Sequence, residues 1–497
     1  MTADQDCKED CDSDNSFHDP DKNLTEHEKA AILSFYILPY SRASQLIIRA
    51  GQEAFVEAGL YTDSLAFLDR TNIGNAKVDG LENSLRLSTS QFNTTLTIFF
   101  VSYATAEPFT NVLLKRINPP RFISTTMIMW GLCMTFMGFV TNWSGLMAAR
   151  WFLGLAEAGL YPGINYYLSC WYKRSEMGIR AAVFFSAAAI SGSFGGLLAA
   201  AIAKMDGLGN LTGWAWLFIL EGSLTVILGI ASFWLVHDFP DKATFLTPED
   251  RARVIHRLKA EKQGSVDHEK FEMKYFLMAL KDYKMWLGMA IFAGADMPLY
   301  AFSIFLPSII KELGYTLTSA QLLSVPPYIF AAILTILVGW IADRKRQRGI
   351  FNILTSTVGI IGFTMLLVSQ RPSVKYAGTF LGALGIYPCL PNTVTWISNN
   401  IEGVYKRGIV LGFVIGWGNL NGIVSSNIYY RAPKYTVGHA VVIAYMTVFL
   451  LGGSILMRFL LNRENNLRRS GERDNQLSDL DSTEDVGDFR HHFIYTL

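Results

Sequence analysis

The chain has 497 residues, of which 51% are hydrophobic and 17% are charged, and its mean hydropathy is +0.25. This composition is typical of an integral membrane protein and argues against a large soluble enzyme. The formal net charge is +1 and the charges are grouped in short loops, so the chain has no basic face of the kind that binds nucleic acid.

Both ends of the chain are polar. Residues 1–29 are acidic and lack the basic start and apolar core of a secretory signal, so we expect a disordered cytosolic tail there. Residues 463–497 are expected to form a second disordered cytosolic tail. Between the tails we expect an N-terminal bundle over 30–236, a cytosolic central loop over 237–284 and a C-terminal bundle over 285–462.

Apolar runs long enough to cross a bilayer follow one another along both expected bundles. A hydrocarbon core about 30 Å thick needs about 20 apolar residues per helix. Together with a doubtful segment before Asp69, the runs form six candidate spans on each side of the charged stretch from Asp238 to Lys284, which predicts an all-α integral membrane protein of twelve transmembrane helices in two six-helix bundles. The clear runs lie near 92–114, 121–141, 144–170, 178–203, 214–236, 285–310, 320–341, 350–369, 374–398, 408–430 and 437–461.

Lysine and arginine are concentrated in alternate loops. Such residues accumulate on the cytoplasmic side of a membrane, which predicts that both termini lie in the cytosol. The basic loops are the central loop and KRINPPR (115–121), WYKRSE (171–176), DRKRQR (343–348) and VYKR (404–407).

Ionisable residues inside the apolar runs are few, and each is a functional candidate because burying a charge in lipid is costly. Arg150 and Glu157 stand seven residues apart in ARWFLGLAEAGLYPG. That spacing is about two helical turns, so both side chains are expected on one face of one helix, and that face cannot point to lipid. The full set is Asp69, Arg70, Glu107, Arg150, Glu157, Glu221 and Asp296.

A cluster of this kind can couple two bound species. Arginine stays charged and recognises a carboxylate through a planar fork of donors, whereas a desolvated aspartate or glutamate can gain a proton. An anionic substrate that takes the arginines frees the carboxylates to bind protons, and loss of those protons on the other side releases the substrate. The alternative is that the ion pairs only hold helices together, and for Glu107, Glu221 and Asp296 this alternative is equally good.

Aromatic and amide side chains in the second half could complete a pocket. Aromatic faces stack on a ring and amides donate and accept hydrogen bonds, so they suit a small ring-bearing anion. Each could equally be a packing residue or an interfacial anchor. The candidates are Tyr300, Asn392, Trp396, Trp417 and Asn419.

The segment GWIADRKRQRG (339–349) has an aspartate followed by a basic run at the end of a span. Asp343, Arg344 and Arg348 could latch one helix end to its neighbour in one conformation and release it in another. A simple basic cytoplasmic loop is the alternative. No metalloprotease, hydrolase, phosphate-loop or dinucleotide motif occurs, so we expect neither an enzyme nor a cofactor or metal site.

Several motifs resemble those of a known family. FLDRTNIGNAKVDGL and RWFLGLAEAGLYPGINYYLSCWYKRSEMGIRAA are similar to the anion:cation symporter branch of the major facilitator superfamily. Further segments resemble the fungal permeases for nicotinate, allantoate and related vitamins or organic acids, with the nicotinate type nearest; the likeness runs from about Phe67 to Arg463. These segments are EPFTNVLLKR, FPDKATFL, AQLLSVPPY, GIYPCLPNTVTWISNN and GWGNLNGIVSSNIY.

The resemblance implies a major facilitator fold and a monomeric plasma-membrane importer that moves a small organic anion together with protons by alternating access. Asp69 and Glu157 match the proton-binding carboxylates of that branch, and Arg70 and Arg150 match its partners for the substrate carboxylate. GWIADRKRQRG is similar to the cytoplasmic gating motif of the superfamily, whereas LLKRINPPRF, its counterpart in the first half, lacks the aspartate. Alternatives are a permease for allantoate, pantothenate or another organic anion, an exporter of a pathway product, or a transporter-like nutrient sensor.

The segment before the first motif departs from these permeases. Residues 41–64 carry several charges where an apolar helix is expected, and a central charge costs about 2.5–3.5 kcal/mol in a transmembrane helix. We hypothesise that part of this segment is a translated intron or another gene-model error, which sequencing of the spliced transcript would test; otherwise the first span is short, amphipathic or re-entrant. The charged residues are Arg42, Arg49, Glu53, Glu57 and Asp63.

Overall fold

The computed structural model separates the chain into residues 1–50 and residues 51–497. All described residues belong to the second unit. The expected tail at 1–29 and the charged segment at 41–64 lie outside them. The structure describes residues 65–497 except 172–173, 244–245, 247, 249–250, 252–253, 256–272, 403, 431–433 and 471–492.

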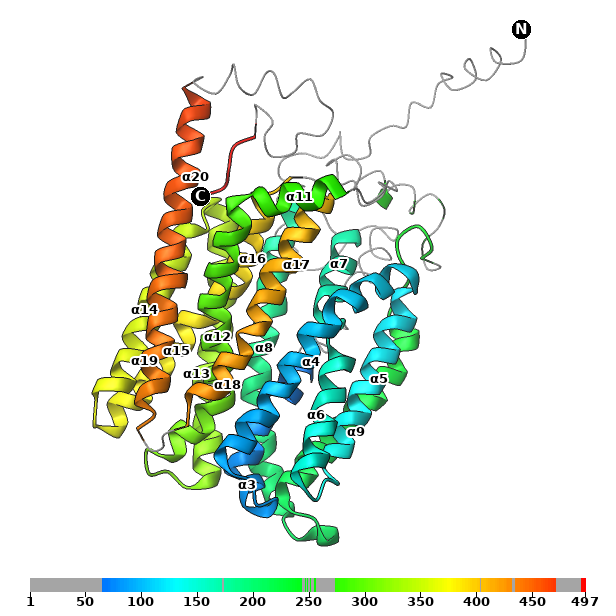
Figure 1. Cartoon of the computed structure of the whole chain (residues 1–497), viewed down its shortest axis with the longest axis vertical. Helices are drawn as coiled ribbons and strands as arrows, with labels where there is room; N and C mark the ends of the chain where they lie inside the picture. The colour runs from blue at the N-terminus through cyan, green and yellow to red at the C-terminus, as the bar shows by residue number, and fades with distance from the viewer. Residues whose placement is uncertain are drawn as a thin grey trace, which may run out of the picture. The chain divides into compact units, whose positions relative to one another are not determined.

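All regular secondary structure in the described residues is helical, without a strand, which confirms the expected fold class (Figure 1). The first helix is described from residue 65 to residue 78 and carries Asp69 and Arg70. The rest of the N-terminal half consists of α3 (Leu81–Ser84), α4 (Thr89–Arg116), α5 (Pro119–Met137), α6 (Trp143–Glu157), α7 (Leu160–Trp171), α8 (Arg174–Ile202) and α9 (Gly213–Leu235).

The C-terminal half repeats this order of helices after α11 (Met273–Lys281), a short helix in the central loop. A π-helical turn over Met446–Gly452 joins the last two helices into one long element. The helices are α12 (Tyr283–Lys311), α13 (Leu317–Lys345), α14 (Gly349–Val368), α15 (Pro372–Ile386), α16 (Cys389–Asn399), α17 (Val404–Leu420), α18 (Gly422–Ile428), α19 (Thr436–Tyr445) and α20 (Gly453–Arg469).

The fourth span of each half is broken near its middle. In the N-terminal half α6 ends at Glu157 and α7 begins at Leu160, and in the C-terminal half α15 ends at Ile386 and α16 begins at Cys389. Each piece is shorter than the about 20 residues that a complete crossing needs. The breaks therefore lie within the bundle, and equivalent breaks in two halves are typical of transporters built from repeats.

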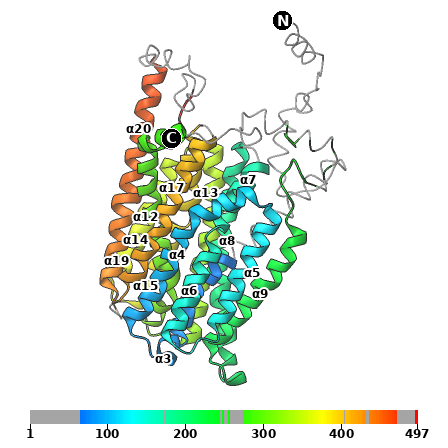
Figure 2. The ribbon, with the colours of Figure 1, turned by 45° about the vertical axis from the view of Figure 1, so that its right-hand side comes forward.

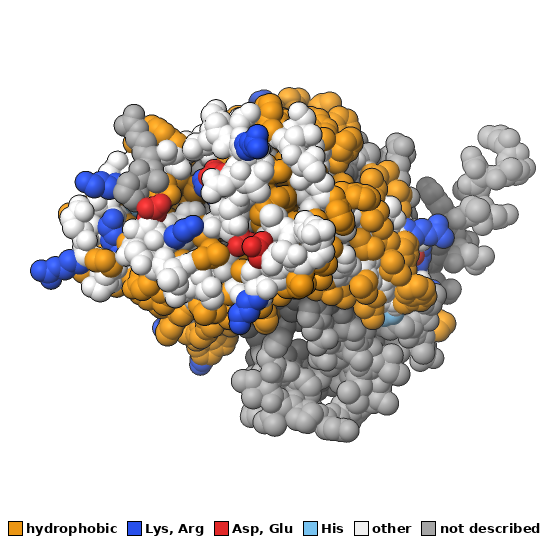
Figure 3. All heavy atoms as spheres, turned by 90° about the horizontal axis from the view of Figure 1, so that it is seen from below, with side chains coloured by type: hydrophobic (Ala, Val, Ile, Leu, Met, Phe, Trp, Pro, Cys, Tyr) orange, Lys and Arg blue, Asp and Glu red, His pale blue; other side chains and the backbone are white. Residues whose placement is uncertain are grey.

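Seven described helices are long and apolar enough to cross a membrane by themselves. Large apolar side chains also cover the outside of the bundle, including Phe109, Trp234 and Phe459, which are 74%, 75% and 61% exposed. Figure 3, a view along the bundle, shows hydrophobic side chains toward the periphery and few, scattered charged ones. This surface suits hydrocarbon rather than water.

Glycines allow helices to approach closely. Ideal Cβ atoms built on Gly192 and Gly196 of α8 would lie 2.8 Å from the Tyr328 ring and 2.6 Å from the Gln321 carbonyl oxygen of α13. The glycine-rich run at 191–201 therefore serves helix packing, because small residues bring helix backbones together in lipid. In the first half α5 packs on both α6 and α9, as Figure 2 shows.

The two halves are in contact at both ends of the bundle. We call these ends the α3 end, which carries α3, and the tail end, where α11 and residues 493–497 lie (Figure 1). At the α3 end Lys311 donates to the Val78 carbonyl oxygen at 3.1 Å, and a Cβ on Gly74 would lie 2.1 Å from the Ile304 carbonyl oxygen. Toward the tail end the halves also touch, because a Cβ on Gly339 of α13 would lie 2.4 Å from the Ala182 Cβ of α8. The halves are therefore in close contact at both ends.

Candidate functional site

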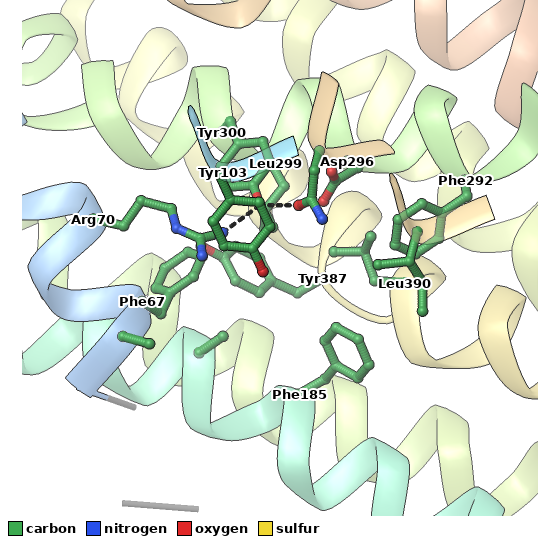
Figure 4. A pocket seen from close by; sticks show the side chains of 14 residues that line it. Phe67, Arg70, Tyr103, Phe185, Phe292, Asp296, Leu299, Tyr300, Tyr387 and Leu390 are labelled. Atoms are coloured by element: carbon green, nitrogen blue, oxygen red, sulfur yellow. Dashed lines mark hydrogen bonds between the residues drawn. The ribbon is translucent and has the colours of Figure 1, made fainter. Parts of the chain in front are cut away.

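A cavity of about 60 Å³ lies between the two halves (Figure 4). Helices from both halves contribute to its wall, so any relative movement of the halves changes its shape. The lining is mostly apolar and aromatic, with a few polar groups, as expected of a small-molecule site. The lining residues are Ala66, Phe67, Arg70, Tyr103, Phe185, Ala188, Phe292, Asp296, Leu299, Tyr300, Tyr387, Leu390, Ile415 and Asn419.

The Arg70 guanidinium is the main charged group on the cavity wall. Its Nε donates to Glu157 Oε1 at 3.1 Å, its Nη2 donates to the same oxygen, and its Nη1 donates to the Tyr300 hydroxyl. Both Arg70 contacts with Glu157 use one carboxylate oxygen, and Oε2 has no hydrogen-bond partner among the described residues. The ion pair therefore lacks the bidentate geometry that makes arginine–carboxylate pairs strongest.

Aromatic rings surround the Arg70 guanidinium. Its Cζ lies 5.3 Å from the centre of the Phe99 ring, 4.9 Å from that of Tyr103 and 5.5 Å from that of Tyr300. These distances fall within the about 6 Å at which a cation is attracted to a ring face. The rings therefore partly replace the water that a guanidinium loses on burial, and they provide flat apolar surface next to the cation.

A hydrogen-bonded chain runs from Arg70 into the C-terminal half. The Tyr300 hydroxyl donates to Asn419 Oδ1 at 3.0 Å, and Asn419 Nδ2 donates to Glu107 Oε2 at 3.4 Å. Asp296 lies on the same wall, and its Oδ2 has no hydrogen-bond partner within the described part of the chain. The cavity thus presents a cation, an amide, a hydroxyl and an unsatisfied carboxylate within one small space.

Asp69 lies on the first helix next to Arg70 but does not line the cavity. Its Oδ2 accepts hydrogen bonds from Trp130 Nε1 at 2.8 Å and from Thr225 Oγ1 at 3.2 Å. Its Oδ1 has no such partner among the residues described. Asp69 is therefore held inside the N-terminal half by α5 and α9, where it does not line the cavity.

Glu221 of α9 extends this buried polar group within the N-terminal half. Its Oε2 accepts from Asn72 Nδ2, and Asn75 Nδ2 donates to Asn72 Oδ1 at 3.0 Å. The amide of Asn72 therefore links Glu221 to the helix that carries Asp69. Glu221, for which the sequence did not distinguish a functional from a structural role, thus belongs to the same buried polar group as Asp69.

Arg150 and Glu157 are buried on one face of α6, as their spacing predicted. Arg150 is 1% exposed, yet its Nε and Nη2 have no hydrogen-bond partner in the described structure. A guanidinium has five N–H donors, and leaving them unsatisfied in an apolar interior is costly. The arrangement leaves donors available for an anion or for ordered water.

The described interior around the cavity contains more carboxylates than cations. If all were ionised, uncompensated negative charge would remain in a medium of low polarity, which is costly. Protons can relieve that cost, so this composition is suited to binding them. The carboxylates are Asp69, Glu107, Glu157, Glu221 and Asp296, against Arg70 and Arg150.

Four of the residues expected to bind substrate do not line the cavity: Arg150, which is buried on α6, and three residues of the C-terminal half. Asn392 donates to the Arg348 carbonyl oxygen and to Asn352 Oδ1, both at 2.8 Å, toward the tail end. Trp396 Nε1 donates to the Thr496 carbonyl oxygen at 2.9 Å. Trp417 is 46% exposed on α17. Tyr300 and Asn419, by contrast, line the cavity with Arg70.

The expected gating residues lie at the tail end of α13 and the start of α14. Arg348 forms an ion pair with Asp343, and its Nη1 donates to Asn392 Oδ1 at 3.1 Å. Arg344 stacks over the Trp340 ring, with Cζ 5.5 Å from the ring centre. Asp343 and Arg348 therefore pair with each other within the C-terminal half.

Sequence reasoning missed several aromatic residues of the cavity wall. Phe67 and Tyr387 meet edge to face with ring centres 6.4 Å apart, although they belong to different halves. Tyr103 stacks on Arg70 from α4. Phe67 precedes the Asp69–Arg70 motif by a few residues and Tyr387 marks the break before α16, but neither position differs in type from many packing aromatics in the chain.

Seven of the described helices are long and apolar enough to cross a membrane, and the two halves enclose a charged cavity between them, an architecture typical of membrane transporters. A family model described as the Major Facilitator Superfamily matches residues 64–457. An uncharacterized transporter of Schizosaccharomyces pombe is 36% identical over 434 residues, covering 86% of each chain. The high-affinity nicotinic acid transporter of Saccharomyces cerevisiae is 33% identical over 409 residues, covering 82% of this chain and 76% of that protein.

The chain belongs to the Major Facilitator Superfamily. Its fold is similar to the crystal structure of a bacterial homolog of the human lysosomal transporter Spinster in an inward-facing and occupied conformation. The TM-score is 0.61 at 15% identity, and the match covers 81% of this chain and 95% of that one. The protein is thus a multi-pass membrane transporter, and the relatives named here are transporters rather than enzymes.

Proposed function

We propose that this transporter takes up a small organic carboxylate together with protons, and that the substrate is nicotinate or a related pyridine carboxylate. The observation that carries the proposal is the position of Arg70. Its guanidinium faces a cavity between the halves, is held by one oxygen of Glu157 and is surrounded by aromatic rings. A guanidinium in such a setting is suited to a planar anion.

Substrate binding begins with competition for Arg70. A substrate carboxylate can accept from two guanidinium nitrogens at once, whereas Glu157 offers a single oxygen to both. The ring of a pyridine carboxylate would then lie against Tyr103 and Tyr300, which flank the guanidinium. Asn419 supplies an amide for a ring nitrogen or substituent. Arg150 does not line the cavity as it stands, but its unsatisfied donors could bind the anion once the halves move.

Proton coupling follows from the displaced carboxylate. Once Arg70 is engaged by substrate, Glu157 remains buried at the end of α6 without that partner. An unpaired buried carboxylate is costly and is relieved by a proton. Asp69, held by Trp130 and Thr225, provides a second proton site on the helix that carries Arg70.

The cavity must expand when substrate enters. Its volume of about 60 Å³ is far below the about 300 Å³ at the lower end of small-molecule sites. Because residues of both halves line it, separation of the halves is the simplest route to a larger site. Alternating access about this cavity therefore accounts for entry from one side and release to the other. We propose a monomer in the plasma membrane with both termini, and so the tail end, in the cytosol.

The choice of substrate rests on a relative and on the shape of the site. The similar yeast protein is named a high-affinity nicotinic acid transporter, and the cation next to flat aromatic surface suits that class of molecule. A permease for allantoate, pantothenate or another organic anion, or an exporter of a pathway product, would use the same guanidinium. A transporter-like nutrient sensor would bind substrate without moving it.

Uptake into proteoliposomes tests the proposal. Purified full-length protein is reconstituted, and labelled nicotinate is followed with and without an inward proton gradient. We expect accumulation only with the gradient, and its loss when a protonophore is added. Uptake that is the same with and without the proton gradient would exclude proton coupling. Binding without uptake would favour a nutrient sensor. Competition by unlabelled hydroxynicotinates, pantothenate, biotin and allantoate then ranks the substrates.

A further inference from the structure

Residues 493–497 (FIYTL) lie as an extended segment against the tail end of the C-terminal half (Figure 1). Tyr495, the middle residue, is 5% exposed. The segment contacts α20, the end of α16, the residue before α14 and Lys284 of α12. Part of the chain between the segment and α20 is not described. Contacts of this number and burial indicate a formed binding groove rather than a chance resting place.

Two buried asparagines recognise the backbone of the segment. Asn465 of α20 donates to the Tyr495 carbonyl oxygen and accepts from the Tyr495 N–H, both at 2.9 Å. Asn400, just after α16, donates to the Thr496 carbonyl oxygen at 2.9 Å and accepts from the Thr496 N–H at 2.7 Å. Successive residues of an extended chain present these groups to opposite edges, so α20 and α16 hold the segment from two sides.

Further contacts fix the side chain and the flanking residues. Two cations lie near the Tyr495 ring, with Arg468 Cζ at 4.5 Å and Lys284 Nζ at 4.9 Å from its centre. Arg468 also donates to the Tyr495 hydroxyl at 3.0 Å and to the Phe493 carbonyl oxygen at 2.7 Å. Such cation–ring contacts favour an aromatic residue at this position.

The far end of the segment reaches the expected gating residues. The backbone N–H of Arg348 donates to the Leu497 oxygen at 2.5 Å. Arg348 is the residue that pairs with Asp343 and donates to Asn392. The segment therefore joins the start of α14 to α16 and α20 at the point where the gating pair lies.

The helix α16 links this groove to the central cavity. It is separated from α15 by the break at Tyr387, its residue Leu390 lines the cavity, and it packs on α8 of the other half. Its other end is held by the segment through Trp396 and Asn400. If α16 moved relative to α20, Asn400 and Asn465 could no longer pair with neighbouring residues of one strand.

We propose that residues 493–497 are an intramolecular peptide ligand that restrains α16, and that the segment must release before α16 can move during transport. Binding of the segment and movement of α16 are mutually exclusive, because the groove exists only when α16, α14 and α20 have the arrangement seen in this structure. A ligand that binds one conformation shifts the population toward it. The segment therefore acts as a brake on the conformational cycle. This role does not depend on which substrate is carried.

Hydrogen exchange of the full-length protein in nanodiscs tests the restraint without any substrate. Asn465→Asp removes the donor to the Tyr495 carbonyl oxygen and places a carboxylate beside it. Asn466→Asp is the matched control, because Asn466 is the next residue of α20 and is exposed. We expect amides of α16 to exchange about tenfold faster in Asn465→Asp, because one hydrogen bond is lost and the new carboxylate repels the Tyr495 carbonyl oxygen. Exchange should stay unchanged in Asn466→Asp and at the amides of α5.

A peptide added to a shortened chain separates a ligand from a merely structural element. In a variant that lacks residues 493–497, a synthetic Phe-Ile-Tyr-Thr-Leu peptide at millimolar concentration should restore protection of α16, and the same peptide with alanine for tyrosine should not. Transport at saturating substrate should be faster in the shortened variant, with KM unchanged. Unchanged exchange in α16, failure of the peptide to protect it, or slower transport would each overturn the proposal.

Discussion

Arg70 and Glu157 form an ion pair in which two guanidinium nitrogens share the single oxygen Oε1. Oε2 of the same carboxylate has no hydrogen-bond partner in the described structure. The pair joins the first helix to the end of α6 beside the cavity. One oxygen of the Glu157 carboxylate can still accept a hydrogen bond. A substrate carboxylate can therefore replace Glu157 at Arg70 without the loss of an ideal bidentate pair.

Replacement of the acid should separate proton coupling from substrate exchange. In Glu157→Gln the amide can still contact Arg70 but cannot carry a proton, so we expect gradient-driven accumulation to be lost while exchange across the membrane continues. Asp69→Asn should behave in the same way. Arg150→Ala should reduce exchange more than either. Accumulation and counterflow of labelled substrate in proteoliposomes measure the two activities, and equal exchange in all three variants would contradict these roles.

Arg70→Lys should weaken substrate binding. Lysine keeps the positive charge but has no planar fork and cannot donate to a carboxylate, Tyr300 and Glu157 in one fixed geometry. We expect KM to rise about tenfold or more, which corresponds to roughly 1.4 kcal/mol. The initial rate of uptake against substrate concentration measures this. An unchanged KM would show that charge alone is sufficient at this position.

Tyr300→Phe should interrupt the chain between the halves. The hydroxyl accepts from Arg70 and donates to Asn419, so its removal leaves both groups short of a partner. Hydrogen bonds to charged groups contribute about 1.5–3 kcal/mol, and we expect binding to weaken about tenfold. Tyr445→Phe serves as the control because Tyr445, at the end of α19, does not line the cavity. Equilibrium binding by scintillation proximity distinguishes the two variants.

Gly385→Leu should disrupt the contact between α14 and α15. A Cβ on Gly385 would lie 2.2 Å from Gly359 Cα, so a side chain forces the helices apart. We expect a fall in melting temperature and in the yield of monodisperse protein, because overpacking costs about 1–3 kcal/mol or more. In Gly412→Leu, where a Cβ meets nothing within 4 Å, the melting temperature should change little. Similar losses in both variants would contradict the close packing seen here.

The stability of the α3 end should depend on pH through Asp79. Burial and the neighbouring carboxylate of Asp206 raise the pKa of Asp79 to about 6, and Lys311 opposes this shift. Because the folded state binds more protons than the unfolded state between the ordinary pKa of about 3.9 and the raised one, stability should fall as the pH rises through this window. Asp79→Asn should lose less stability between pH 4 and pH 7 than the native chain. Melting curves of the native chain, of Asp79→Asn and of the exposed loop variant Asp241→Asn at pH 4 and pH 7 test this. Equal losses of stability in all three proteins would exclude Asp79 as the source of the pH dependence.

The local sequence was sufficient to predict the membrane spans and the burial of several charged residues. The length of each apolar run follows from the thickness of the bilayer, so the order of helices in both halves could be predicted before any contact was known. The placement of Arg150 and Glu157 on one face of α6 follows from helical periodicity. The family also followed from local motifs, because the segments around Asp69 and Glu157 are specific in their order of residue types.

Only the tertiary structure decided which residues meet. Arg70 pairs with Glu157 across 87 positions and with Tyr300 across 230, and no periodicity encodes contacts between helices so far apart in the chain. Asn392 resembled a pocket amide by composition, yet the break before α16 places it toward the tail end. A polar C-terminal stretch expected to be disordered includes residues 493–497, which lie in a groove formed by separate helices. These outcomes depend on how helices pack against one another, and that is set by side chains from the whole chain at once.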